Sequence, residues 1–227
     1  MKANTPHFFI LLALLFTPFV SNSQLNLQVG YGLGFTNFPI HSQITDLYKL
    51  KNPWLDQGFK ELKYMNGMMA GFRYSWNSIS TGLNWRFRQA KLEAKGMEPI
   101  TMQDFSKTLH YNLQAFSVLL ETHGGFLNLG STIEYNLLNI KEIHTNSENK
   151  QRVLQTSVFG SQFYVNINFP ASRLCRISLQ PYYFLGWSPI SMQTLENHLS
   201  GTQDAEVRKQ SLNHFGINLI LNNGPQH

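Results

Sequence analysis

The residues of this 227-residue chain most able to do chemistry are charged side chains that interrupt otherwise uncharged, alternating stretches. They are four arginines and one glutamate, namely Arg73, Arg86, Arg88, Glu134 and Arg176. Each stands at a polar position between apolar neighbours, so we expect all five to point to the polar side of a sheet. Guanidinium and carboxylate groups brought together there form a polar network of ion pairs.

One pair within this set is predicted by its position. Arg86 follows the turn after Ser78 by eight residues, and Glu134 follows the turn after Gly125 by nine. The two side chains should therefore lie at similar height, with one strand between their own strands. We expect them to meet if the sheet encloses a narrow interior. The alternative is that water solvates each of them separately.

Serine and histidine could supply a nucleophile and its base, as in lipid hydrolases and acyltransferases. The available pairs are His110 with Ser117 and His41 with Ser42, and no motif surrounds either of them. The chain also lacks a glycine-rich phosphate loop, an H-E-x-x-H sequence and paired cysteines at metal-binding spacing. We therefore expect a protein that is not an enzyme, with no catalytic residue, cofactor or metal ion.

The elements that position these residues are strands with an alternation of period two. Residues 25 to 35 read L-N-L-Q-V-G-Y-G-L-G-F, with an apolar side chain at every odd position and an amide or glycine between. Successive side chains of a strand point to opposite faces, so one face of this strand is wholly apolar. A transmembrane strand needs about 9 to 11 residues, and this stretch has that length.

Seven further stretches alternate in the same way, at about 66 to 76, 79 to 89, 109 to 121, 127 to 137, 157 to 169, 176 to 187 and 214 to 221. A two-residue turn at Asn77 and Ser78 would pair Phe72 with Leu83 on one face. The apolar positions change parity near Phe116 and Ser117, which predicts a β-bulge there. Pro181 lacks a backbone N–H and predicts a second bulge.

The connections between these strands alternate between long and short. The long ones cover 36 to 64, 90 to 108, 141 to 155 and 188 to 208, and the short turns lie at 77 to 78, 122 to 125 and 170 to 173. In the first long connection, Asn52 and Pro53 predict the start of a short helix with an apolar stripe of Leu55, Phe59 and Leu62. We expect this stripe to pack against the barrel rim, and a partner-binding face is the alternative. The whole pattern predicts an all-β fold, an eight-stranded antiparallel up-and-down transmembrane β-barrel.

Side-chain volume decides which face points outward. The apolar faces carry many large side chains, which are Trp76, Trp85, Trp187, Phe72, Phe87, Phe159, Phe163 and Tyr183. An eight-stranded lumen is only just wide enough for side chains to fill, so this set would overfill it. We therefore expect the apolar set to face hydrocarbon, with interfacial aromatics that include Phe35, Tyr111 and Phe169. The alternative is a soluble, lipocalin-like secreted barrel with the faces reversed.

This strand count and the alternation of short turns with long loops resemble the small eight-stranded bacterial outer-membrane β-barrel proteins. The resemblance covers the mature chain at the level of architecture, and it implies a location in the outer membrane of a Gram-negative cell. It also implies that the short turns and both termini face the periplasm. The chain departs from the family at its end, where Leu221 to His227 lacks the terminal aromatic residue that members present to the insertion machinery.

The first 23 residues predict a cleaved signal peptide. Lys2 precedes an apolar run from Phe8 to Phe16, and the small residues Ser21 and Ser23 suit cleavage before Gln24. A membrane anchor is the alternative, but the run is short and Pro18 interrupts its end. Residues 24 to 227 then form a single barrel domain.

The formal charge of +5 does not indicate nucleic acid as a partner. The lysines of the mature chain fall in the long connections, which also carry most of its aspartate and glutamate, and no nucleic-acid motif accompanies them. Cys175 is the single cysteine, so the chain forms no internal disulfide.

Three classes of function remain open. The first is a non-catalytic barrel that stabilises the outer membrane or presents its long loops to lipids or partner proteins. The second is an accessory subunit of an export or surface-assembly machine, and the third is a lipid-modifying enzyme. A wide, porin-like pore is not expected, because eight strands leave a filled interior.

Overall fold

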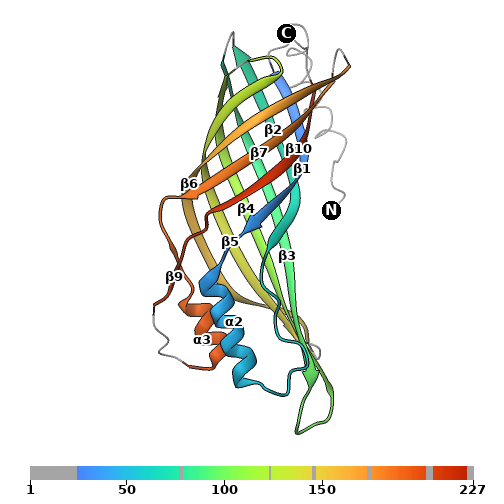
Figure 1. Cartoon of the computed structure of the whole chain (residues 1–227), viewed down its shortest axis with the longest axis vertical. Helices are drawn as coiled ribbons and strands as arrows, with labels where there is room; N and C mark the ends of the chain where they lie inside the picture. The colour runs from blue at the N-terminus through green and yellow to red at the C-terminus, as the bar shows by residue number, and fades with distance from the viewer. Residues whose placement is uncertain are drawn as a thin grey trace, which may run out of the picture.

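Eight strands of the computed structural model close into one antiparallel barrel (Figure 1). The structure describes residues 25–76, 79–122, 124–144, 147–172, 175–202 and 207–223. The barrel strands are β1 (Leu25–Thr36), β2 (Tyr64–Trp76), β3 (Ile79–Met97), β4 (Asp104–Thr122), β5 (Leu127–His144), β6 (Ser147–Ser172), β7 (Cys175–Gly186) and β10 (His214–Asn223). Each pairs with its neighbours in the chain, and β10 closes the barrel on β1. The predicted all-β, up-and-down fold class is confirmed.

The predicted signal peptide lies outside the described residues, as do the turn at Asn77 and Ser78 and the last four residues. The pairing beside that turn is the predicted one, since Phe72 lies opposite Leu83.

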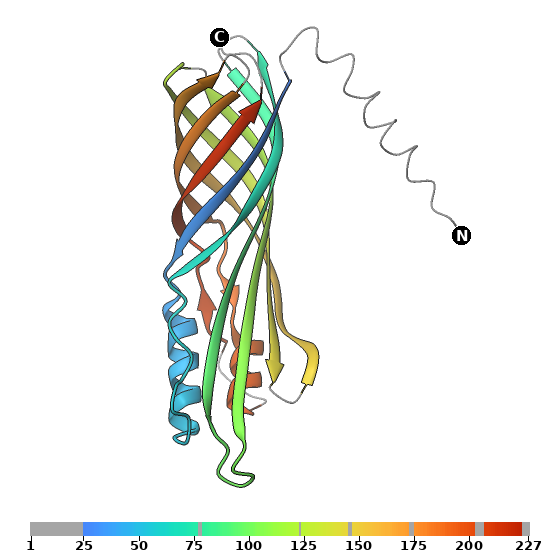
Figure 2. The ribbon, with the colours of Figure 1, turned by 90° about the vertical axis from the view of Figure 1, so that its right-hand side faces the viewer.

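The strands differ greatly in length, and this decides the shape of the molecule. β3, β4, β5 and β6 have 19, 19, 18 and 26 residues, whereas β1, β2, β7 and β10 have 12, 13, 12 and 10. The four long strands are consecutive in the barrel, so together they continue past the short ones as a curved sheet (Figure 2). Beyond the short strands, one side of the barrel is therefore open.

Two helices occupy that open side. α2 (Pro39–Lys51) follows β1, and it begins with a proline at its first position, where no backbone N–H is needed. α3 (Gln193–Ser200) follows β7 and ends at Gly201, whose φ of 68° is a left-handed conformation that glycine adopts without strain. A short pair of strands, β8 (Ile190–Ser191) and β9 (Lys209–Gln210), lies beside them. Among the described residues, neither helix is long and apolar enough to cross a membrane.

We call the helices, their connections and the projecting sheet the distal lobe, which comprises the described residues within 37–63, 90–113, 138–158 and 188–212. Its hydrophobic core is formed by Phe38, Ile44, Tyr48, Leu55, Phe59, Leu62, Leu92, Ala94, Leu109, Tyr111, Leu113, Leu138, Ile140, Val153, Leu154, Val158, Ile190, Met192, Leu195, Leu199 and Leu212, and Met65 of β2 and Phe184 of β7 pack against it from the barrel. Ile44 and Tyr48 of α2 and Leu195 and Leu199 of α3 contribute the buried faces of the helices. The helices therefore convert an open half-barrel into a packed unit.

The polarity of the two sheet faces inverts along the long strands. In the first half of β3 the outward side chains, such as Leu83 and Trp85, are apolar, and the inward Arg86 is buried. In the second half the outward Lys91 is exposed and the inward Leu92 is buried. The first pattern suits a strand between hydrocarbon and a polar lumen, and the second suits one between water and an apolar core.

The bulge predicted near Phe116 and Ser117 is wrong, because this inversion of polarity accounts for the change of parity. β4 keeps one register with β3 from Ile79↔Thr122 to Met97↔Asp104, and one with β5 past both residues. Leu113 and Ala115 are inward and buried, whereas Phe116 and Val118 are outward and about half exposed. The apolar residues change parity because the surroundings of the strand change, and its backbone stays regular.

The bulge predicted at Pro181 is also wrong. Pro181 lies opposite Ile217 in an uninterrupted register with β10, and β7 has the same register with β6 at Tyr182 as at Leu179. The proline therefore removes a ladder hydrogen bond without adding a residue to the strand. The register shifts of the barrel lie elsewhere, in β5–β6 near Ile140 to His144 and in β6–β7 at Pro170 to Ser172.

Two of the predicted long connections are mostly strand. β3 and β4 extend through the segment 90 to 108, and β5 and β6 extend through 141 to 155, because charged residues there form the wet face of a sheet. The predicted helix after Asn52 is wrong as well, since α2 ends where that helix was expected to begin. Its stripe of Leu55, Phe59 and Leu62 is nevertheless buried against the barrel, as expected. Tyr111 is buried in the distal lobe and does not belong to an interfacial girdle.

A pair of arginine substitutions on β4 tests this description. Val118 lies near the middle of the apolar belt and is 54% exposed, so Val118→Arg should place a cation in hydrocarbon and cost about 2 to 4 kcal/mol. Asn112→Arg, on the same face of β4 but beyond the belt, should cost little. Urea denaturation in lipid vesicles measures both. A neutral Val118→Arg would indicate that this face lies in water.

Candidate functional site

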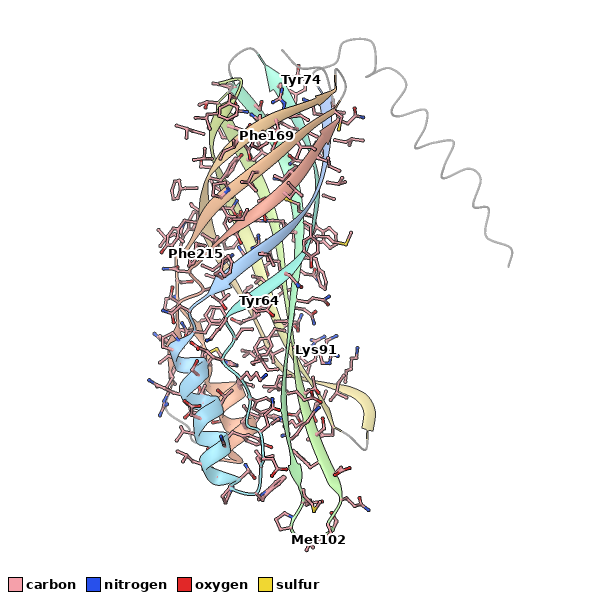
Figure 3. All side chains as sticks on the ribbon, turned by 45° about the vertical axis from the view of Figure 1, so that its right-hand side comes forward. Tyr64, Tyr74, Lys91, Met102, Phe169 and Phe215 are labelled. Carbon is pink, nitrogen blue, oxygen red and sulfur yellow. The ribbon has the colours of Figure 1, made fainter. Side chains whose placement is uncertain are left out.

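The outer surface of the barrel carries a continuous belt of exposed apolar side chains between the short-turn end and the distal lobe (Figure 3). The belt comprises Leu27, Val29, Tyr31, Leu33, Met68, Phe72, Tyr74, Ile79, Leu83, Trp85, Phe116, Val118, Leu120, Leu129, Ile133, Phe159, Phe163, Phe169, Tyr183, Leu185, Phe215, Ile217, Leu219 and Leu221. Water-soluble monomers rarely expose an apolar patch above a few hundred Å². A belt that encircles the barrel is the surface of a protein that lies in lipid.

Inside the belt, Glu121 is the centre of the first polar cluster. Its Oε1 accepts hydrogen bonds from Arg73 Nη1 at 2.7 Å and Asn128 Nδ2 at 2.8 Å, and its Oε2 accepts from Tyr164 Oη at 3.0 Å and Asn166 Nδ2 at 2.6 Å. Both the arginine and the glutamate are buried. Sequence reasoning placed Arg73 here and missed Glu121, although the outward Phe116, Val118 and Leu120 indicate an inward residue 121.

Arg86 and Glu134 form the second cluster, and the structure brings them into direct contact across the lumen. Both side chains are almost fully buried. Arg86 also donates to the amide oxygen of Gln162, and the hydroxyl group of Thr132 donates to Glu134. The two residues come from β3 and β5 with β4 between them, and the narrowness of the lumen lets their long side chains meet.

Arg88 and Arg176 complete the set predicted from the sequence. Arg88 is buried at the end of the lumen next to the distal lobe, where Nη1 lies 3.1 Å from His214 Nε2 and Nη2 donates to Asn218 Oδ1 at 3.1 Å. Its guanidinium carbon also lies 4.8 Å from the centre of the Tyr182 ring, within range of a cation–π interaction. Arg176 is half-buried at the short-turn end of β7 and pairs in register with Asn222 of β10.

Large side chains fill the rest of the lumen by packing over glycines. A Cβ atom on Gly130 would lie 2.2 Å from the Tyr164 ring, and one on Gly216 would lie 2.3 Å from the Tyr182 hydroxyl oxygen. Both tyrosines are 5% exposed. The lumen is thus occupied by hydrogen-bonded side chains, and its end next to the distal lobe is closed by the apolar core of the lobe.

In the distal lobe, Glu142 holds helix α3 to the projecting sheet. Its carboxylate lies 3.2 Å from Lys107 Nζ and 3.0 Å from His198 Nε2 of α3, and it also contacts His144. Burial alone would raise the pKa of Glu142, but the hydrogen bond from His198 and the charge of Lys107 outweigh it and lower the pKa to about 2. The ammonium group of Lys107 also lies 5.1 Å from the Tyr48 ring, which links α2 to the same cluster.

His41 is a second buried titratable group of the lobe. It is fully buried on α2, and its Nε2 contacts the Tyr111 hydroxyl group of β4. Burial lowers the pKa of His41 to about 4, so the ring is neutral at pH 7. Burial also raises the pKa of Tyr111 above its ordinary value.

Neither candidate serine–histidine pair is formed. Ser117 is buried and faces inward, whereas His110 stands at a position of opposite parity on β4 and faces outward. Ser42 donates to the backbone oxygen of Phe38, and the ring of His41 contacts Tyr111 instead. Among the residues that the structure describes, no group of three or more His, Cys, Asp or Glu side chains is placed to hold a metal ion.

A groove of about 1150 Å³ opens on the side of the distal lobe, next to the belt. It runs between residues 57 to 64, which lead into β2, and residues 89 to 93 of β3. Residues 110 to 112 of β4 and Lys150 of β6 complete its lining. Burial first, and then the nearby charges of Lys91 and Lys150, lower the pKa of His110 below its ordinary value.

Comparisons with known proteins give a structural likeness only. No protein-family model matches the chain. No curated protein matches it in sequence.

The solved structures similar to the chain include three small barrels. Ail, the attachment invasion locus protein of Yersinia pestis, solved with the heparin analogue sucrose octasulfate, is 11% identical with a TM-score of 0.43 over 88% of this chain and 96% of its own. The N-terminal β-barrel domain of Pseudomonas aeruginosa OprF is 8% identical with a TM-score of 0.39 over 89% and 98%. Neisserial surface protein A is 7% identical with a TM-score of 0.39 over 90% and 98%.

The closed eight-stranded barrel with its apolar belt has the architecture of the small outer-membrane barrels, as the sequence pattern indicated. Similarities of this degree say nothing of a shared ligand or activity.

A double-mutant cycle tests the lumen pair. Arg86→Ala and Glu134→Ala should each destabilise the barrel by about 3 to 5 kcal/mol, because each leaves one buried charge without its partner. The double variant should lose clearly less than the sum of the two. Urea midpoints in micelles give the three values, and strictly additive losses would show that the two groups are solvated independently.

The stability of the distal lobe should fall as the pH drops from 6.5 to 4. In this window unfolded His41 takes up a proton while the folded, buried ring does not, so protonation favours the unfolded state. The contribution is fully present above pH 6.5 and is reduced by about 2 to 3 kcal/mol at pH 4.5. Urea denaturation at pH 7 and 4.5 measures it. His41→Gln, which retains a hydrogen-bonding side chain, should reduce this pH dependence by that amount, and an unchanged dependence would contradict the assignment.

Proposed function

We propose that the protein is a non-catalytic outer-membrane barrel that conducts nothing and presents its distal lobe outside the cell. The observation that carries this proposal is the division of the long strands into two environments. Within the apolar belt they enclose a filled polar lumen, and beyond it they carry a packed lobe with two helices. The barrel then acts as an anchor, and the lobe is the part that meets lipids or partner proteins.

The predicted signal peptide supports the location, because an exported barrel with an apolar belt needs a membrane beyond the inner one. The orientation follows from the pattern of such barrels, in which short turns face the periplasm and long connections face outward. The distal lobe lies at the end opposite Thr122 and Ser172, where β4 and β6 end, and would therefore be external (Figure 1).

The lumen argues against a role as a pore. Within the described residues, its cross-section is filled by buried side chains, which are Arg73, Arg86, Arg88, Glu121, Glu134, Tyr164 and Tyr182. The apolar core of the distal lobe lies next to them. A lipid-modifying enzyme is not favoured either, because the structure separates Ser117 from His110 and leaves His41 buried against Tyr111. An accessory subunit of a surface-assembly machine would use the same external lobe.

Cysteine labelling of intact cells tests the location and orientation. In a Cys175→Ser background, Ile100→Cys places a thiol at the tip between β3 and β4, where Ile100 is 92% exposed. A membrane-impermeant maleimide should label this variant on intact cells. Asn223→Cys, exposed at the end of β10 on the short-turn side, should be labelled only after the outer membrane is permeabilised.

The labelling, together with a conductance measurement, distinguishes this proposal from three alternatives. Labelling of residue 223 alone on intact cells would reverse the orientation. No membrane-bound protein at all would favour a soluble secreted barrel, and a steady ionic conductance of the purified protein in a planar bilayer would contradict the filled lumen.

A further inference from the structure

The groove of the distal lobe lies along an open strand edge. β2 pairs with β3 only as far as Asn66↔Gln89, and the next contact along that edge is the single bridge Gln57↔Lys95. From Gln57 to Asn66 the chain takes nine residue steps, whereas β3 takes six from Lys95 to Gln89. The longer segment bows away from β3, and this separation creates the groove (Figure 3).

Backbone groups of β3 point into this opening. Gln57 and Lys95 exchange both of their backbone hydrogen bonds, at 3.0 and 2.8 Å, so the backbone of Lys95 faces this edge. In a strand the N–H and C=O groups of every second residue face the same edge, so those of Lys91 and Glu93 face it too. All of these residues lie opposite residues of β4, and by the same alternation the backbone groups of Ala90, Leu92 and Ala94 are the ones that face β4. Within the described part of the chain, no backbone partner lies opposite Lys91 and Glu93 on the groove side.

The two sides of the groove differ in character. Its inner side is formed by the apolar side chains of Leu62, Ala90 and Leu92 and by the Tyr111 ring. Lysines dominate the outer side. Glu61 lies 3.8 Å from Lys63, and Glu93 lies 3.2 Å from Lys95. Among the ion pairs of the described residues, none includes the remaining lysines of the lining, Lys60, Lys91 and Lys150.

We propose that this groove binds an extended acidic peptide segment of a partner protein, which adds to the sheet as a strand on the open edge of β3. The segment alternates apolar and acidic residues, so that the apolar side chains meet Leu62 and Leu92 while the carboxylates meet Lys91 and its neighbours. Strand addition of this kind obtains affinity from main-chain hydrogen bonds and specificity from alternate side chains. The inference rests on the proposed function, because a foreign segment reaches the groove only if the lobe is external.

An anionic lipid headgroup is the competing occupant, since the groove begins beside the belt. The open edge offers two backbone carbonyl groups as well as two N–H groups. A phosphate oxygen can accept hydrogen bonds but cannot donate one to a carbonyl group, so it would leave the two acceptors without partners. A peptide strand satisfies both kinds of group, and its apolar side chains cover the inner side.

Peptide binding to the full mature protein, refolded in micelles, tests the proposal. The probe is a fluorescent, end-capped heptapeptide of alternating glutamate and valine that begins and ends with glutamate, followed by anisotropy. It should bind, and it should slow hydrogen exchange of the Lys91 and Glu93 amides in particular. The same peptide with lysine in place of glutamate should bind at least about tenfold more weakly, because like charges repel.

Selective N-methylation separates strand addition from simple charge attraction. In a hydrogen-bonded antiparallel pair the glutamates that share a face with Lys91 also point their backbone groups toward β3. N-methylation of the glutamates should therefore abolish binding, and N-methylation of the valines, whose N–H groups point away, should leave it unchanged.

Substitutions of Lys91 in the protein test the same charge attraction and main-chain hydrogen bond as the modified peptides. Lys91→Gln removes the cation and should weaken binding, and Lys91→Pro also removes the N–H group and should weaken it further, by about tenfold or more in total. An edge position tolerates proline because its N–H group has no ladder partner. Lys209→Gln, which removes an exposed lysine outside the groove, should bind as the wild type does.

Three results would overturn the proposal. Equal binding of the two N-methylated peptides would exclude strand addition, and equal binding of the lysine peptide would exclude charge complementarity. Protection of Lys91 by lipopolysaccharide micelles but by no peptide would assign the groove to a lipid headgroup. Peptide binding together with cell labelling of residue 223 alone would uphold the groove and contradict the orientation.

Discussion

The boundary between hydrocarbon and water is the constraint on which the rest of this structure depends. Four strands cross it without interruption, and at about Gln89 on β3 their inner and outer faces exchange polarity. On the short-turn side of that level, charged groups in the narrow lumen need partners, and Arg73 pairs with Glu121 and Arg86 with Glu134. On the side of the distal lobe the outer face is in water, so the inner face can hold an apolar core.

The unequal strand lengths follow from the same division. An open half-barrel with an apolar concave face is unstable in water unless something covers it. Helices α2 and α3 supply that cover, and Glu142 ties α3 to the sheet through His198 and Lys107. The lobe therefore depends on the barrel strands for its sheet, and the lobe closes the barrel at the end opposite the short turns.

Coverage of the half-barrel is incomplete along one edge. The chain that returns from α2 to β2 meets β3 at Gln57 and again at Asn66. Between these two points, within the described residues, Lys91 and Glu93 pair with β4 on one side and have no paired strand on the other. Exposed strand edges are usually blunted by lysines, which discourage pairing between identical chains. The same lysines would favour an acidic segment, so the edge can be protected from aggregation and selective for a partner at once.

The sequence by itself determined the number of barrel strands, the outward orientation of the belt and the inward position of Arg73, Arg86, Arg88 and Glu134, because alternation of period two is a local property of a strand. It misassigned the distal lobe, since a wet sheet over an apolar core has the same alternation with the opposite parity. Only the tertiary structure decided that Tyr111 is buried under α2, that Glu121 pairs with Arg73 and that β3 has an open edge. These contacts join residues from strands and helices far apart in the chain, and no local pattern encodes them.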